Sequence, residues 1–155
     1  MKKLILSLLL AAFVGGNTLS AQTITKNEDG KYSLSVGHVT LTVDAQKGGK
    51  IVSYRYDDKE ILSQTKIPNS FGSTFWTSPQ SEWNWPPVPE YDTKPFNAEV
   101  AGDKLILTGE KSKRFGYRVR KELTTDKKDN AIVITYTIIN ESGETRKVAP
   151  WEISR

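Results

Sequence analysis

The sequence predicts an all-β protein, an antiparallel β-sandwich. Three observations lead to this fold class. Apolar and polar residues alternate in most segments, as in strands that bury one face. Clusters of Gly, Asp and Asn separate these segments at regular spacing. Beyond the N-terminal residues, no stretch repeats apolar residues at helical spacing for three turns. Eight or nine short strands of this kind favour a sandwich of antiparallel neighbours.

The strands are expected in the following order. The first four are predicted at residues 32–36, 38–43, 50–56 and 60–62. Turns at 47–49 and 57–59 join the later pairs, and glycine supplies the positive φ that the turn at 47–49 needs. Further strands are predicted at 97–100, 105–108, 117–123, 131–139 and 146–151. The segment 117–123 alternates strictly, with Tyr117, Val119 and Leu123 on one side and Arg118, Arg120 and Glu122 on the other.

Residues 64–95 interrupt this pattern. The stretch FWTSPQSEWNWPPVPEYDTKPF (75–96) holds three of the chain's four tryptophans and five of its seven prolines. Disordered segments are poor in aromatic residues, and long connections in compact domains are most often functional. Prolines preset an extended backbone and remove donors. We therefore expect an ordered segment that lies on the sheet without pairing to it.

The aromatic segment contains the groups that a sugar site needs. A tryptophan ring stacks on the C–H face of a pyranose, and planar polar groups bind its hydroxyls. The segment supplies Trp76, Trp83 and Trp85 together with Gln80 and Glu82. The alternative is that these rings close one end of the sandwich as part of its core.

A second tryptophan lies beside a carboxylate near the end of the chain. Trp151 and Glu152 follow the most apolar predicted strand and a turn, with Arg155 three residues further on. Glu152 is a candidate catalytic acid or base, and Trp151 and Arg155 are candidate sugar-binding residues. The alternative is an edge carboxylate paired with an arginine.

Composition excludes several other classes of site. The chain has no cysteine, so thiol catalysis and thiolate metal sites are excluded. His38 is the only histidine, which excludes a Ser-His-Asp triad and a multi-histidine metal site within this chain. No metal or cofactor is predicted. Basic residues do not cluster apart from Lys111, Lys113 and Arg114, so nucleic-acid binding has no support.

The N-terminal residues read as a signal peptide. Lys2 and Lys3 precede an apolar run at 4–14, and Ala21 ends a predicted cleavage site. The run is shorter than the roughly 20 residues that span a bilayer, so no stable membrane span is expected after cleavage. A retained anchor is the alternative. The domains predicted are a signal peptide at 1–21 and one β-sandwich domain at 22–155. The absence of cysteine in an exported chain favours a bacterial periplasmic or secreted protein.

Four blocks resemble a known family. They are GGKIVS (48–53), GSTFWTSPQ (72–80), WNWPP (83–87) and APWEISR (149–155). They resemble an exported bacterial family of unassigned function, which is similar to the galactose-mutarotase-like superfamily of aldose 1-epimerases and glycan-processing enzymes. The resemblance implies a large antiparallel sandwich, of which this chain would be the first half, incomplete at its C-terminal end.

The resemblance is only partial at the catalytic positions. Aldose epimerases present a histidine at the strand end that the block at 147–152 resembles, whereas this chain has Trp151 and Glu152 there. No histidine falls within 73–85, and the family's glutamate base would lie beyond Arg155. The resemblance therefore implies sugar binding more than mutarotation. Three functions stay open: an exported carbohydrate-binding protein, a sugar-processing enzyme of epimerase or lyase type that uses Glu152, and a structural or assembly module without a ligand.

Overall fold

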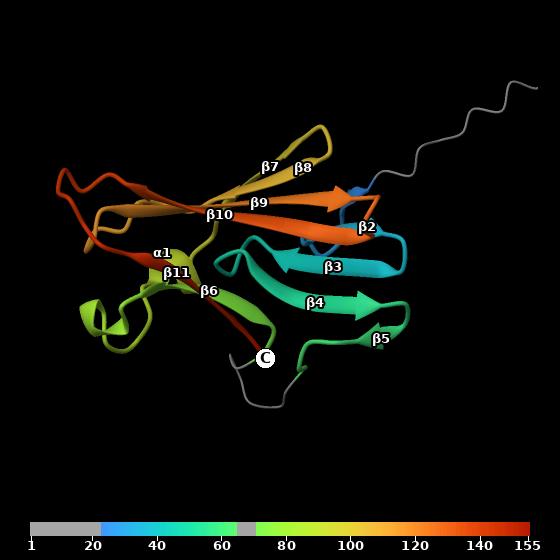
Figure 1. Ribbon diagram of the computed structural model, residues 1–155, viewed down its shortest axis with the longest axis horizontal. Helices are drawn as coiled ribbons and strands as arrows, with labels where there is room; N and C mark the ends of the chain where they lie inside the picture. Colours follow the sequence, from blue (N-terminus) through green and yellow to red (C-terminus); the bar gives the residue numbers. More distant parts are fainter. Residues whose placement is uncertain (1–22, 65–70) are drawn as a thin grey trace, which may run out of the picture.

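Two antiparallel sheets form the molecule, in a computed structural model that describes residues 23–64 and 71–155. The sheets lie in two layers, which confirms the predicted β-sandwich (Figure 1). The predicted signal peptide at 1–21 lies outside the described residues.

The first sheet has seven strands in the order β1-β2-β3-β4-β6-β11, with β5 paired to β4. Their bounds are β1 (Ile24–Lys26), β2 (Tyr32–Val36), β3 (Val39–Asp44), β4 (Lys50–Tyr56), β5 (Lys59–Glu60), β6 (Ser73–Ser78) and β11 (Ala149–Ser154). The strands β1 to β5 follow one another as hairpins, whereas β11 returns from the end of the chain to pair with β6.

The second sheet has four strands in the order β10-β9-β8-β7. Their bounds are β7 (Asn97–Ala101), β8 (Lys104–Thr108), β9 (Tyr117–Asp126) and β10 (Ala131–Asn140). The β9–β10 ladder is in register over ten residue pairs, from Tyr117 opposite Asn140 to Asp126 opposite Ala131. The predicted alternation in 117–123 is confirmed, because Tyr117, Val119 and Leu123 are buried and Arg118, Arg120 and Glu122 are half-buried.

The core lies between the two sheets. Its largest fully buried side chains from the first sheet are Phe75, Leu34 and Val43, and those from the second sheet are Tyr117, Leu105, Leu107, Leu123 and Val119. Because adjacent residues of a strand point to opposite faces, each sheet presents one apolar face to the other.

The expectation of an unpaired segment at 64–95 was wrong in part. Ser73–Ser78 forms β6, which pairs with β4 at one position and with β11 along its whole length. A 3₁₀ turn, η1 (Gln80–Glu82), and a short helix, α1 (Pro89–Asp92), follow it. Strand β6 was not predicted because both of its faces are covered, so its apolar residues do not alternate with polar ones.

Strand β10 forms an edge of the second sheet. Ile132, Ile134, Tyr136 and Ile138 point toward the core from this strand but remain only partly buried. A small hollow of about 190 Å³ lies between β10 and the first sheet, lined by Ile132 and Ile134 on one side and by Leu41 and Ile51 on the other. No helix among the described residues has the length and apolar character needed to cross a membrane.

Candidate functional site

The pairing of β6 with β11 brings two tryptophans of distant sequence together. Trp76 lies directly opposite Trp151 in the ladder, and their ring centroids are 5.6 Å apart at an angle of 85°. Phe75, the neighbour of Trp76, stacks on Tyr136 of the second sheet. Since neighbours along a strand alternate, Trp76 and Trp151 occupy the face of the first sheet that points away from the second.

Two further tryptophans complete a cluster around Trp76. Trp83 and Trp85 also stand edge-on to it, with centroid separations of 5.6 Å and 6.1 Å. Edge-to-face packing is a favourable arrangement of aromatic rings. The name tryptophan cluster is used below for Trp76, Trp83, Trp85 and Trp151.

The four rings of the tryptophan cluster differ in exposure. Trp76 is 9% exposed and Trp83 is 2% exposed, whereas Trp151 is 37% and Trp85 is 70% exposed. The indole N–H of Trp83 donates to the backbone carbonyl of Thr77 at 2.8 Å. Trp76 and Trp83 therefore belong to the packed interior, while Trp85 and Trp151 offer ring surface to the solvent.

Charged groups hold the central ring of Trp76 in place. Its indole N–H donates to Asp92 Oδ1 at 2.9 Å, and the Thr74 hydroxyl donates to the same oxygen at 3.0 Å. Asp92 ends helix α1, so these bonds tie α1 to strand β6, beside which it lies in Figure 1. The guanidinium of Arg155 lies 5.8 Å from the centre of the Trp76 ring.

An open groove lies beside Trp151, the one member of the tryptophan cluster that lines it. It has a volume of about 560 Å³, within the range of about 300–1,000 Å³ typical of ligand pockets. Its lining consists of Ser78, Pro79, Gln80, Ser81, Ala149, Pro150 and Trp151. Ring surface and polar groups thus share one depression, which is the combination that binds sugars.

The turn that carries Gln80 is held by a side chain from the β8–β9 connection of the second sheet. The guanidinium of Arg114 donates to the backbone carbonyl of Glu82 at 2.8 Å and to that of Trp83 at 3.4 Å. The amide of Gln80 donates to the backbone carbonyl of Asn84 at 3.4 Å. Asn84 adopts a φ of 56°, which asparagine tolerates better than most residues. The turn is therefore fixed by the fold before any ligand arrives.

Glu152 lies on the opposite face of the sheet from the tryptophan cluster. It pairs with Phe75 in the β6–β11 ladder and points between the sheets. Its Oε1 accepts a hydrogen bond from the Ser73 hydroxyl, and its Oε2 is buried without a partner among the described residues. The neighbours Trp151 and Glu152 therefore cannot contact the same face of one sugar ring.

Lys121 of strand β9 is buried between the sheets near Glu152. The residue is 2% exposed, and its ammonium donates to the backbone carbonyls of Gly48 at 3.1 Å and Gly49 at 2.9 Å. Three rings surround it within 6 Å: Phe75 at 5.8 Å, Phe96 at 5.5 Å and Tyr136 at 5.7 Å. This is an aromatic cage of the kind that binds cations.

Burial changes the acidity of this interior cluster. It lowers the pKa of Lys121 to about 8, although the negative charges of Glu152 and Asp92 oppose the change. Burial and the charge of Glu152 raise the pKa of the Tyr136 hydroxyl well above its usual value. Groups with perturbed pKa values gather at functional sites, and they also occur in structural ion networks.

The structure brings most of the predicted binding residues together. Trp76, Trp83, Trp85 and Trp151 form the cluster, Gln80 lines the groove beside it, and Arg155 covers Trp76. Glu82 lies half-buried in η1, outside the lining of the groove. Glu152 faces the interior instead.

Two residues were missed by the sequence reasoning. Lys121 is in phase with Val119 and Leu123, which is the signal that places it on the buried face of β9. Asp92 gives no signal in the sequence, because its partners lie 16 and 18 residues away on another element.

Comparisons with known proteins give little further information. No family model matches the chain, and no curated protein matches it. Among solved structures, 4-alpha-glucanotransferase from Thermococcus litoralis is similar, with 15% identity and a TM-score of 0.47. The match covers 74% of this chain and 23% of that enzyme, so the chain spans about a quarter of the enzyme's length. A likeness of this degree assigns neither a family nor a function.

Proposed function

We propose that this chain is an exported carbohydrate-binding protein, related to the galactose-mutarotase-like superfamily. The resemblance of the blocks at 72–80 and 149–155 supports the relation, and the N-terminal signal-peptide pattern supports export to the periplasm or beyond. Sugar rings stack on Trp85 and Trp151, and the groove along 78–81 receives their hydroxyls.

The main support for this proposal is that two exposed tryptophan rings pack against one buried tryptophan ring. Trp85 is 70% exposed and Trp151 is 37% exposed, and both pack edge-on against the buried ring of Trp76. A rigid aromatic surface binds with little loss of conformational freedom, because its rotamers are already set. Single exposed hydrophobic side chains are common, so the support for binding lies in the shared contact of Trp85 and Trp151 with Trp76.

Polar groups along the groove match the needs of a sugar. Gln80 supplies an amide, and Ser78 and Ser81 supply hydroxyls. These groups bind hydroxyls in a plane next to the ring of Trp151, which gives the orientation that stacking alone does not provide.

The proposal is tested by alanine variants of the exposed rings. Affinities for a panel of soluble polysaccharides are measured by affinity gel electrophoresis and calorimetry for the wild type, Trp85→Ala and Trp151→Ala. We expect each variant to bind its polysaccharide about tenfold more weakly or worse, which corresponds to ~1.4 kcal/mol.

Tyr56→Ala is the matched control, because Tyr56 is 54% exposed at the far end of strand β4. This variant should bind as the wild type does. Equal affinities for all four proteins, with unchanged circular dichroism, would refute the proposed site.

A second candidate function, sugar-processing chemistry, is favoured by the surroundings of Glu152. The Glu152 carboxylate is buried beside the Tyr136 hydroxyl, and its charge acts on the Lys121 amine, whose pKa burial lowers, so Glu152 and Lys121 would serve as an acid–base pair. This function predicts faster interconversion of sugar anomers by the protein, measured by polarimetry, and its loss in Glu152→Gln. The same slow rate with and without protein would leave Glu152 as a structural partner of the buried cluster.

A further inference from the structure

A second hollow lies on the other side of the turn that holds Gln80. It has a volume of about 470 Å³ and lies between two loops, the β8–β9 connection within the second sheet and the β10–β11 connection between the two sheets. Its lining consists of residues 111–116 from the first loop, and of Glu141, Ser142, Glu144 and Arg146 from the second. The name basic pocket is used for it below.

The two walls of the basic pocket are fixed to each other by backbone contacts. The N–H of Glu141 donates to the carbonyl of Gly116 at 2.8 Å. Gly116 has a φ of +71°, and a Cβ at this position would lie 2.7 Å from Ser142 Cα. Only glycine allows this close approach without displacement of the neighbouring loop.

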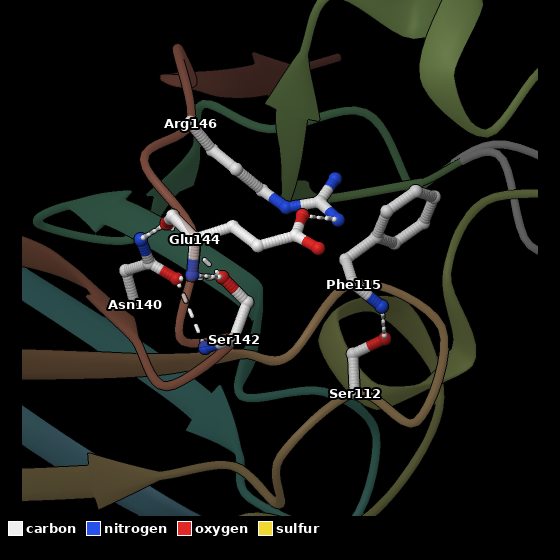
Figure 2. A network of polar contacts seen from close by, with 6 residues as sticks. All are labelled: Ser112, Phe115, Asn140, Ser142, Glu144 and Arg146. Atoms are coloured by element: carbon white, nitrogen blue, oxygen red, sulfur yellow. Dashed lines mark hydrogen bonds and ion pairs between the residues drawn. The ribbon is translucent and has the colours of Figure 1, made fainter.

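The β10–β11 loop is also ordered by its own side chains (Figure 2). The amide of Asn140 donates to the carbonyl of Glu144 at 2.7 Å, and the N–H of Glu144 donates to the Ser142 hydroxyl at 3.1 Å. Ser112, a buried residue of the lining, accepts a hydrogen bond at its hydroxyl from the N–H of Phe115 at 3.3 Å (Figure 2). The pocket therefore exists without a ligand.

Positive charge dominates the lining of the basic pocket. Four basic side chains, Lys111, Lys113, Arg114 and Arg146, face two acidic ones, Glu141 and Glu144. Both carboxylates are already engaged, Glu141 with Arg118 at 3.1 Å and Glu144 with Arg146 at 2.9 Å.

Three of these cations, Lys111, Lys113 and Arg114, form no ion pair with a carboxylate among the described residues. Lys111 and Arg114 donate to backbone carbonyls, of Glu141 and of Glu82 respectively. Lys113 has no hydrogen bond or ion pair with the part of the chain that the structure describes, although it contributes, after Lys94, to the lowered pKa of Glu110. Cations on a preformed concave surface favour an anionic ligand with several acceptor oxygens.

The basic pocket borders the groove beside the tryptophan cluster. Arg114 of the pocket binds the carbonyl of Glu82, which follows the groove residue Ser81 in the chain. Arg146 of the pocket and Ala149 of the groove are three residues apart, so their Cα atoms lie within about 11 Å. One short oligosaccharide can therefore reach both.

From this arrangement we infer that the ligand is an acidic oligosaccharide, whose carboxylate or sulfate groups occupy the basic pocket while a neighbouring sugar ring lies on the exposed tryptophans. The inference rests on the proposed sugar-binding function and adds the class of sugar. Lys113 is the cation that meets the anionic group, and Arg114 keeps its place on the turn.

The experiment follows both sites at once by NMR of the ¹⁵N-labelled protein. A galacturonic acid trisaccharide, a sulfated galactose trisaccharide and a neutral galactose trisaccharide are titrated into the wild type, Lys113→Glu and Lys127→Glu. Indole signals report on the groove, and backbone amide signals of residues 111–116 report on the basic pocket. Lys127 is an equally exposed lysine in the β9–β10 turn, at the opposite end of strand β9.

We expect one or both acidic sugars to shift both sets of signals and to bind more tightly than the neutral sugar at low salt. Lys113→Glu should lower the affinity for the acidic sugars roughly tenfold and leave the affinity for the neutral sugar unchanged. Lys127→Glu should behave as the wild type. The acidic sugar that binds more tightly shows whether the basic pocket prefers a carboxylate or a sulfate.

Equal affinity of the wild type for acidic and neutral sugars, with no shift of residues 111–116, would overturn the inference and leave the proposed function intact. An equal loss of acidic affinity in Lys113→Glu and Lys127→Glu would overturn it as well, because it would show attraction to the net charge of the whole protein. Absence of any indole shift with all three sugars would instead contradict the proposed function.

Discussion

Trp151 lies directly across from Trp76 in the β6–β11 ladder, with the two rings nearly perpendicular at 85°. One member of the pair is buried and the other is 37% exposed. The buried ring fixes the exposed one, so the surface that meets a ligand depends on packing below it.

Asp92→Ala should loosen the support of Trp76. The Oδ1 atom of Asp92 accepts hydrogen bonds from the indole N–H of Trp76 at 2.9 Å and from the Thr74 hydroxyl at 3.0 Å. Removal leaves two donors without partners, so the free energy of unfolding should fall by about 1–3 kcal/mol in urea denaturation. Asp103→Ala, in the exposed β7–β8 turn, should stay within about 0.5 kcal/mol of the wild type. Equal stability of the two variants would show that Asp92 does not hold the cluster.

Gly48→Ala should cost more than Gly102→Ala, although both glycines have a φ of +64°. This conformation costs an L-residue about 1–2 kcal/mol at either position. A Cβ at Gly48 would in addition lie 2.4 Å from the carbonyl oxygen of Asp92, whereas one at Gly102 meets nothing within 4 Å. Thermal unfolding of both variants measures the difference, and equal midpoints would contradict the close approach of the turn to α1.

The free energy of unfolding should rise with pH from about pH 8 toward pH 10. Burial lowers the pKa of Lys121 from 10.5 to about 8, so within this window the unfolded chain holds a proton that the folded protein has lost. The slope due to this residue approaches about 1.4 kcal/mol per pH unit. Above about pH 10 the trend reverses, because burial raises the pKa of Tyr91 and Tyr136 and the unfolded chain then loses its protons first.

The variant Lys121→Met isolates the contribution of this lysine. Its pH slope in urea denaturation between pH 8 and 10 should be smaller than that of the wild type, with a remainder from Lys50, whose pKa burial also lowers. Lys127→Met, at an exposed turn, should keep the wild-type slope. The same slope in all three proteins would mean that Lys121 is charged and solvated alike in both states.

The strands were largely predictable because one face of each is buried. The alternation of apolar and polar residues predicted the strand at 50–56 with the same bounds as in the structure, Lys50–Tyr56. The last strand was predicted at 146–151 but runs over Ala149–Ser154, and Ile24–Lys26 is too short to give a pattern. Strand β6 escaped prediction because Phe75 and Trp76 are both buried, on opposite faces.

The candidate site was predicted in its residue types but not in its geometry. Trp151 and Glu152 are neighbours in the sequence, and strand geometry places them on opposite faces. Lys121 has a charged side chain, so its alternation with Val119 and Leu123 was not interpreted as burial. The basic residues Lys111, Lys113 and Arg114 were visible as a group, but Arg146 joins them only through the fold.

The central claim, that exposed tryptophans bind a sugar, is tested most directly by the four indole N–H signals of the protein. The signals are assigned with Trp85→Phe and Trp151→Phe, and polysaccharide fragments are then added. The signals of Trp85 and Trp151 should shift, whereas that of Trp83, which is 2% exposed and donates its N–H to Thr77, should not. Four unmoved signals across neutral and acidic sugars would contradict the account and leave the tryptophan cluster as a packing element of the sandwich.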